Sequence, residues 1–182
     1  MHELTKREVY RAIEHAKSID EAAGRKILEN FELEQTALAQ TLFGMFPSVI
    51  AEQNRDMAHL FMDLCFDTIC VFEQAFGPLP SQKHMDIGWL EKQALLLDTE
   101  LKSLSADVPM DKRIREKLQD RFVKRAKEDL PQLELTEYLN LAIDEFASEL
   151  PSRVPAIRIT RTLIFVTVRL FCNLYGHAAN RK

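Results

Sequence analysis

Apolar side chains recur at intervals of three and four residues along most of the chain, which is the period of an amphipathic α-helix. Glycine and proline, which end helices and form tight turns, are sparse, because the 182 residues include only 5 Gly and 7 Pro. An all-β fold needs more turns than these residues can supply. The pattern therefore predicts an all-α fold, a single-domain bundle of about six to seven helices.

Capping and turn residues set the expected helix boundaries. Ser18 and Glu21 have the spacing of a capping box, in which two side chains satisfy unpaired backbone amides at a helix start. Gly44 and Pro47 are expected to end that helix, and Ser48 is expected to cap the next. The expected helices cover about 3–16, 19–44, 48–76, 86–101, 109–130, 135–150 and 156–177.

The last of these segments, 156–177, also has features of a β-strand. It is rich in isoleucine, valine and threonine, whose branched side chains favour a pleated setting. However, it is much longer than an ordinary strand and lacks strict alternation of apolar and polar positions. We therefore expect a helix.

The segment 48–76 is apolar on nearly all sides, which predicts a long central helix around which the others pack. Its polar residues include Asp56, His59, Asp63 and Asp67, spaced 3, 4 and 4 residues apart. At 100° per residue these four side chains share a face about 80° wide. We call this set the acidic stripe.

The acidic stripe has two interpretations that need no metal. Charged side chains are mostly exposed, so the stripe can be the solvent face of the helix. A buried stripe would instead need cations, and Arg158, Arg161 and Arg169 of the last helix also fall within about 80° of one another. The two rows span the same length, so they could form a partly buried ladder of ion pairs.

A metal site is the third interpretation of the stripe. Asp56, His59 and Asp63 could present nitrogen and oxygen ligands to a divalent metal from one helix. Carboxylate-bridged di-metal bundles usually carry two Glu-x-x-His pairs, whereas this chain has a single comparable Asp-x-x-His. We therefore predict no cofactor and assign no residue a catalytic role.

The charge distribution and the cysteine content indicate the cellular compartment of the protein and the kinds of partner that it binds. Residues 1–104 carry a net charge of −7 and residues 105–182 carry +3, which allows a division into an acidic and a basic half and suits self-association. The three cysteines lie in apolar runs, and the first residues lack the apolar core of a secretory signal, so we expect a cytoplasmic protein. The least polar stretch, 156–175, contains three arginines, which argues against a membrane span.

Several classes of chemistry lack their sequence motifs. Phosphate-binding glycine loops, the Gly-x-Ser-x-Gly turn of hydrolases and the ligand sets of zinc sites are all absent. The segment 111–129 holds eight basic residues, but five acidic residues interrupt them. Nucleic-acid binding is disfavoured because it needs uncompensated cations and stacking aromatics.

Two classes of function remain. The first is a non-catalytic helical bundle that acts by protein–protein association, as a homo-oligomer or as an adaptor. The second is a helical enzyme or a ligand or metal sensor, whose pocket would be lined by the acidic stripe and by the facing arginines. The sequence favours the first class, because motifs for catalysis are absent and the long helices carry more bulky apolar residues than one bundle is expected to bury.

Overall fold

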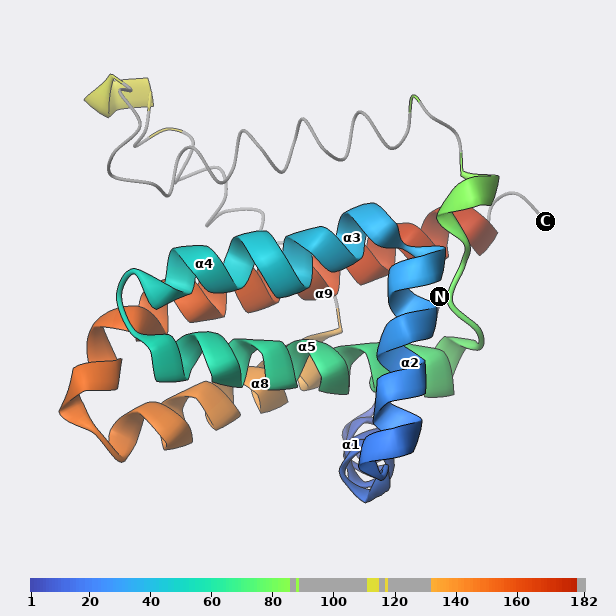
Figure 1. Cartoon of the computed structure of the whole chain (residues 1–182), viewed down its shortest axis with the longest axis horizontal. Coiled ribbons are helices and arrows are strands. Elements are labelled where there is room, and N and C mark those ends of the chain that lie inside the picture. The colour runs from blue at the N-terminus through green and yellow to red at the C-terminus, as the bar shows by residue number, and fades with distance from the viewer. Residues whose placement is uncertain (86–87, 89–110, 115–116, 118–131, 180–182) are drawn as a thin grey trace. The chain divides into compact units, whose positions relative to one another are not determined.

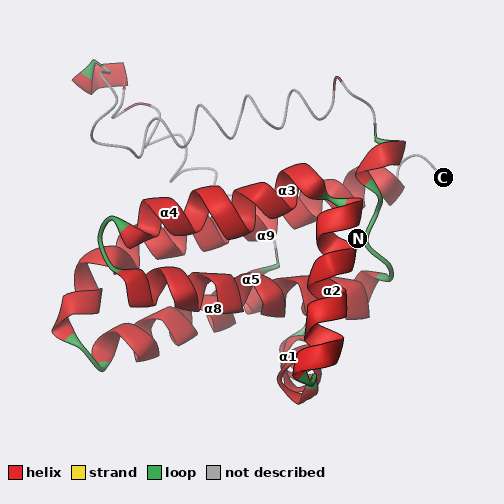
Figure 2. Ribbon diagram, in the orientation of Figure 1, coloured by secondary structure: helices red, strands yellow, loops and turns green. Residues whose placement is uncertain are grey.

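The computed structural model describes residues 1–85, 88, 111–114, 117 and 132–179. Within these residues the chain forms seven α-helices and no strand, which confirms the all-α fold class (Figure 2). The chain divides into two compact units, one made of residues 1–83 and 131–182 and the other of residues 84–130. Most of the helix expected over 86–101 and most of the basic segment 111–129 lie outside the described residues.

The first unit contains all the helices discussed below. Their bounds are α1 Lys6–Ser18, α2 Glu21–Glu34, α3 Thr36–Gln40, α4 Phe46–Ala51, α5 Arg55–Phe76, α8 Leu133–Ser148 and α9 Ile157–Ala179. A π-helical turn, Thr41–Met45, joins α3 to α4, and a 3-10 helix, Pro151–Ala156, joins α8 to α9. The rod formed by α3, the π-helical turn and α4 lies alongside α5 and α9, and α8 packs on α9 (Figure 1).

The capping box of this protein lies at α1, not at α2. The Thr5 hydroxyl accepts a hydrogen bond from the Glu8 amide, and the Glu8 carboxylate accepts one from the Thr5 amide at 2.8 Å. The expected box of Ser18 and Glu21 is wrong, because the Ser18 hydroxyl donates to the His15 carbonyl. Asp20 caps α2 instead, by accepting from the Ala23 amide at 2.8 Å.

The expected helix 19–44 is also wrong, because the chain bends at Gln35 and then continues past Pro47. Gln35 leaves the helical region, with φ −137° and ψ 54°, so that α2 runs across the direction of α3 (Figure 1). Proline lacks the N–H that a regular helix would use at this point. Just before Pro47 the π-helical turn changes the hydrogen bonding, because the Phe46 amide donates to the Thr41 carbonyl, five residues earlier. Pro47 then lies in the first turn of α4, where a missing N–H is tolerated.

The expected helix 48–76 is correct at its C-terminal end and wrong at its start. The chain reverses over 52–54, and Asn54 caps α5 by accepting from the Met57 amide at 2.9 Å. The Ser48 hydroxyl, expected to be a cap, donates to the Gly44 carbonyl within the preceding rod. Gly77 ends α5 with φ 89°, a backbone conformation that glycine adopts without strain.

Even with a shorter span, α5 is the central helix of this unit. It packs against α1, α4, α8 and α9. Ten of its residues are buried, and their side chains fill the space between these helices. At its C-terminal end the ring of Phe72 lies 5.1 Å from that of Phe171 and 5.6 Å from that of Tyr175, both on α9. The Tyr175 hydroxyl donates to the Gly77 carbonyl at 3.0 Å.

The prediction of a helix for the last segment is confirmed by α9, in spite of its branched residues. The hydroxyls of Thr160, Thr162 and Thr167 each donate to the carbonyl four residues earlier, at 2.8 to 2.9 Å. Threonine can therefore be buried in this helix without an unsatisfied polar group. On α8 the buried face includes Leu139, Ile143 and Ala147, and Leu150, just beyond the end of the helix, is exposed.

The reversal at Asn54 predicts unequal effects for two conservative substitutions. Asn54→Ala removes the cap of α5 and should lower the free energy of unfolding by about 1 to 2 kcal/mol. Ser48→Ala, on the exposed side of the preceding rod, should change it by less than about 0.5 kcal/mol. Urea denaturation measures both values, and a larger effect at Ser48 than at Asn54 would show that the helix begins where the sequence pattern placed it.

Candidate functional site

The acidic stripe lies along α5 and mostly faces solvent. Asp56, His59 and Asp63 are exposed, and Asp67 is half-buried. These positions agree with the interpretation of the stripe as a solvent face for three of its four members. Asp67 is the exception, because α1 covers part of it and brings Lys17 close enough to interact with its carboxylate.

The arginines expected to face the stripe lie on α9, and two of the residues in the expected ladder have other partners. Arg161 forms an ion pair with Asp144 of α8. Arg169 is half-buried, and its guanidinium carbon lies 5.7 Å from the centre of the Phe165 ring. Arg158 is exposed at the start of α9. Asp56, at the other end of the expected ladder, pairs with an arginine outside this set.

That arginine is Arg153, in the 3-10 helix between α8 and α9. Its side chain is 11% exposed, and its Nε and Nη2 atoms lie 3.3 and 3.2 Å from Oδ2 of Asp56. Its Nη1 atom donates to the Glu149 carboxylate at 2.9 Å and to the Phe146 carbonyl at 3.0 Å. The guanidinium carbon lies 3.7 Å from the centre of the Phe146 ring, a cation–π distance. One side chain thus joins α5, α8 and the turn between α8 and α9.

A second contact fixes the same turn. The side-chain amide of Asn54, which caps α5, donates to the Ser152 carbonyl at 3.1 Å. The turn before α5 and the turn between α8 and α9 therefore meet at one end of the unit (Figure 1). Both contacts join residues almost a hundred positions apart, so no local pattern in the sequence could reveal them. The one local signal was the spacing of Glu149 and Arg153, which is that of an i,i+4 ion pair.

The outer side of this turn is apolar. Leu150 is 45% exposed and Val154 is 52% exposed, and the two prolines at 151 and 155 are exposed as well. We call these four residues the apolar corner. Exposed leucine and valine are common when they occur singly, but here both fall within residues 150–155, on a segment held by several hydrogen bonds.

Asp67 belongs to a polar junction between α1, α5 and α8. Burial raises the pKa of Asp67 to about 6, while the positive charge of Lys17 lowers it and the negative charge of Asp63 raises it. The pKa of Lys17 is raised, first by a hydrogen bond to the Tyr138 side chain and then by the charges of Asp67 and Glu145. Burial also raises the pKa of Asp63, while the positive charge of His59 lowers it, so Asp63 and Asp67 both titrate above the range of an ordinary surface carboxylate.

The described residues do not support a metal centre. Within them, no group of three or more His, Cys, Asp or Glu side chains is placed so that it could hold a metal ion, Asp56, His59 and Asp63 included. Nor does any helix among them combine the length and the apolar character that crossing a membrane requires.

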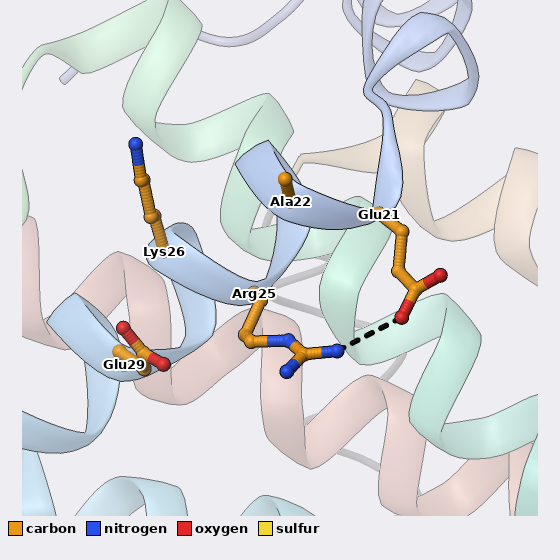
Figure 3. A pocket seen from close by; sticks show the side chains of 5 residues that line it. All are labelled: Glu21, Ala22, Arg25, Lys26 and Glu29. Carbon is orange, nitrogen blue, oxygen red and sulfur yellow. Dashed lines mark hydrogen bonds and ion pairs between the residues drawn. The ribbon is translucent and has the colours of Figure 1, made fainter.

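Helix α2 and the rod that follows it border hollows in the described surface. One of about 400 Å³ is lined by Glu21, Ala22, Arg25, Lys26 and Glu29, all from α2 (Figure 3). Arg25 pairs with Glu21 at 2.9 Å, and Lys26 points away from that pair. Ligand sites usually bring polar groups from several elements to one point, which these side chains do not do.

Comparison with known proteins adds no assignment: no family model, no curated protein and no solved structure matches this chain.

The junction at Asp67 predicts a pH-dependent effect on stability. Because the pKa of Asp67 is raised in the folded state, its ionised form destabilises the protein above about pH 6, and this penalty disappears as the pH falls towards 4. Asp67→Asn should therefore raise the free energy of unfolding at pH 8 by about 1 to 2 kcal/mol and leave it unchanged at pH 4.

The measurement is chemical denaturation of both proteins between pH 4 and 8. Glu14→Gln, which removes the same charge from an exposed position on α1, is the matched control and should not reproduce this pH dependence. A gain that is equal at pH 4 and pH 8 would contradict the assigned burial of Asp67.

The geometry at Arg153 predicts that lysine cannot replace it. Arg153→Lys keeps the charge but loses the planar group that binds two carboxylates and lies over Phe146, so the free energy of unfolding should fall by about 1 to 2 kcal/mol. Arg158→Lys, the same change at an exposed arginine five residues later, should cost less than about 0.5 kcal/mol. Equal losses for the two variants in urea denaturation would contradict the account of the turn.

Proposed function

We propose that this protein is not an enzyme and acts by binding another protein through the apolar corner, either as a homo-oligomer or as an adaptor. The observation that carries this proposal is the exposure of Leu150 and Val154, each followed by an exposed proline, on a turn that Arg153 holds in place. Apolar side chains gathered at one exposed place are typical of protein interfaces.

The rigidity of the corner supports the proposal. Binding costs less free energy when the binding surface is already ordered, because less conformational entropy is lost. The guanidinium of Arg153 and the amide of Asn54 restrain the turn before any partner arrives. Proline at 151 and 155 restricts the backbone further.

The alternative function, an enzyme or a ligand or metal sensor at the acidic stripe, has one supporting observation. The half-buried carboxylate of Asp67 interacts with the exposed ammonium of Lys17, so groups of both charges meet there, as they do in many functional sites. Elemental analysis of the purified protein tests the metal version: a stoichiometric divalent metal would favour this alternative over association.

Association predicts a specific effect of removing the corner's apolar side chains. The double variant Leu150→Ser/Val154→Ser should weaken self-association, or binding to the adaptor partner, by at least about tenfold, because it removes two exposed anchors without touching Arg153. The double variant Leu33→Ser/Leu141→Ser is the control, since these leucines are 62% and 52% exposed on α2 and α8, away from the corner.

Light scattering over a range of protein concentrations measures the homo-oligomeric form of the proposal. The wild type and the control should associate, and the corner variant should remain monomeric at the same concentrations. If the control weakens association as much as the corner variant, the interface lies elsewhere. A wild type that stays monomeric throughout would overturn the homo-oligomeric form.

A further inference from the structure

The segment before α1 is held to the first turn of α8 by hydrogen bonds to its backbone. The Leu4 amide donates to Oε1 of Gln132 at 2.7 Å, and Nε2 of Gln132 donates to the His2 carbonyl at 2.9 Å. One side-chain amide therefore makes both hydrogen bonds that a neighbouring β-strand would make with residues 2 and 4. We call residues 2–4 the strap.

The side chains of the strap also have defined sites. Leu4 is buried, the ring of His2 meets the ring of Phe76 edge-on at 5.2 Å, and the charge of Glu3 influences the thiol of Cys172 on α9. The strap thus lies against residues of α5, α8 and α9. Phe76 ends α5, Cys172 lies on α9 and Gln132 directly precedes α8, so the surface under the strap is built by the fold and not by one helix face.

The strap supplies a cap that α8 lacks in its own sequence. Gln132, the residue before α8, makes no side-chain hydrogen bond to the first turn of this helix. The Leu133 amide instead donates to the carboxylate of Glu3, which lies 130 positions earlier in the chain. A carboxylate is well placed there, because the N-terminus of a helix carries unpaired amides and a partial positive charge.

Gln132 is the most unusual residue of this site. Its backbone is left-handed, with φ 55° and ψ 62°, and among the described residues it is the one non-glycine residue with positive φ. Its side chain is buried, so both ends of its amide need hydrogen-bond partners, and the strap provides them. Strained residues with buried polar groups often mark binding sites, so the surface at Gln132 is a candidate binding site.

We propose that the surface formed by Gln132, the first turn of α8 and the buried position that Leu4 occupies, called here the Leu4 pocket, is a binding site for an extended peptide that carries Glu followed by Leu. In this structure the protein's own strap occupies the site, and a segment of a partner protein with the same two side chains replaces it. The backbone bonds to Gln132 fix an extended chain, while the Leu pocket and the Leu133 amide select the sequence. This mode resembles the addition of a strand to an open edge.

Exchange of the strap does not require α1 to unfold. The capping box of Thr5 and Glu8 holds the start of α1 by itself, so release of residues 2–4 leaves the helix intact. The inference rests on the proposed function in that both concern protein binding, but it names a different surface and the chemistry of its partner. The peptide site and the apolar corner can therefore fail separately.

The test uses a fluorescent peptide with the sequence of residues 1–6 and the full chain carrying Leu4→Asp, which removes the strap from its pocket. Fluorescence anisotropy should show that this variant binds the peptide at least about tenfold more tightly than the wild type, whose own strap competes. A peptide with aspartate in place of leucine should bind neither protein. Leu33→Asp, the same change at an exposed leucine, is the control and should bind as weakly as the wild type.

Failure of the folded Leu4→Asp variant to bind at about 1 mM peptide would overturn the proposal, as would equal binding of the two peptides. If the variant does not fold by circular dichroism, hydrogen exchange in the wild type decides the question. The Leu4 amide should exchange faster in the presence of excess peptide, and an unchanged rate would also overturn the proposal. Leu150→Ser/Val154→Ser should leave peptide binding unaltered, which separates this site from the apolar corner.

Discussion

The burial of α5 imposes the main constraint on this fold. A helix that is apolar on most of its circumference must be covered on most of its circumference, and α1, α4, α8 and α9 provide that cover. Polar residues are then confined to a narrow strip, and the acidic stripe is what remains at the surface. The two candidate binding surfaces lie at opposite ends of α5, where Arg153 contacts its first turn and the strap contacts its last.

At both ends a polar side chain holds a non-helical segment to the helices. Arg153 binds the carboxylates of Asp56 on α5 and Glu149 at the end of α8, and Gln132 binds the backbone of the strap. Helices satisfy their own backbone groups internally, but turns and extended segments need outside partners. Such contacts fix the direction of the chain at the ends of the bundle. They also hold the apolar corner and the proposed peptide site in defined positions.

Much of the helical content could be predicted from the sequence, because periodicity is a local signal. The C-terminal end of α5 at Gly77 and the helical form of α9 follow from local residues.

The reversal at Asn54 could not be predicted. In the sequence, Gly44 and Pro47 resemble the end of a helix and Ser48 resembles the start of the next, but the π-helical turn lets the rod continue through all three. One of the three interpretations of the stripe paired it with arginines of α9, whereas Asp56 pairs with Arg153, because the fold and not the spacing decides which arginine is near. Gln132 carried no sequence signal, since its partners lie 128 and 130 positions away.

Native-state hydrogen exchange tests most directly whether the structure is organised around α5. The account predicts that amides from Phe61 to Phe72 exchange only when the whole unit unfolds, with the free energy of global unfolding, because these residues lie in the centre of the core. Amides of α2, where Phe31 is the one buried residue, should exchange through local opening at lower free energy. Exchange of α5 through local opening, as readily as α2, would contradict the central place given to this helix.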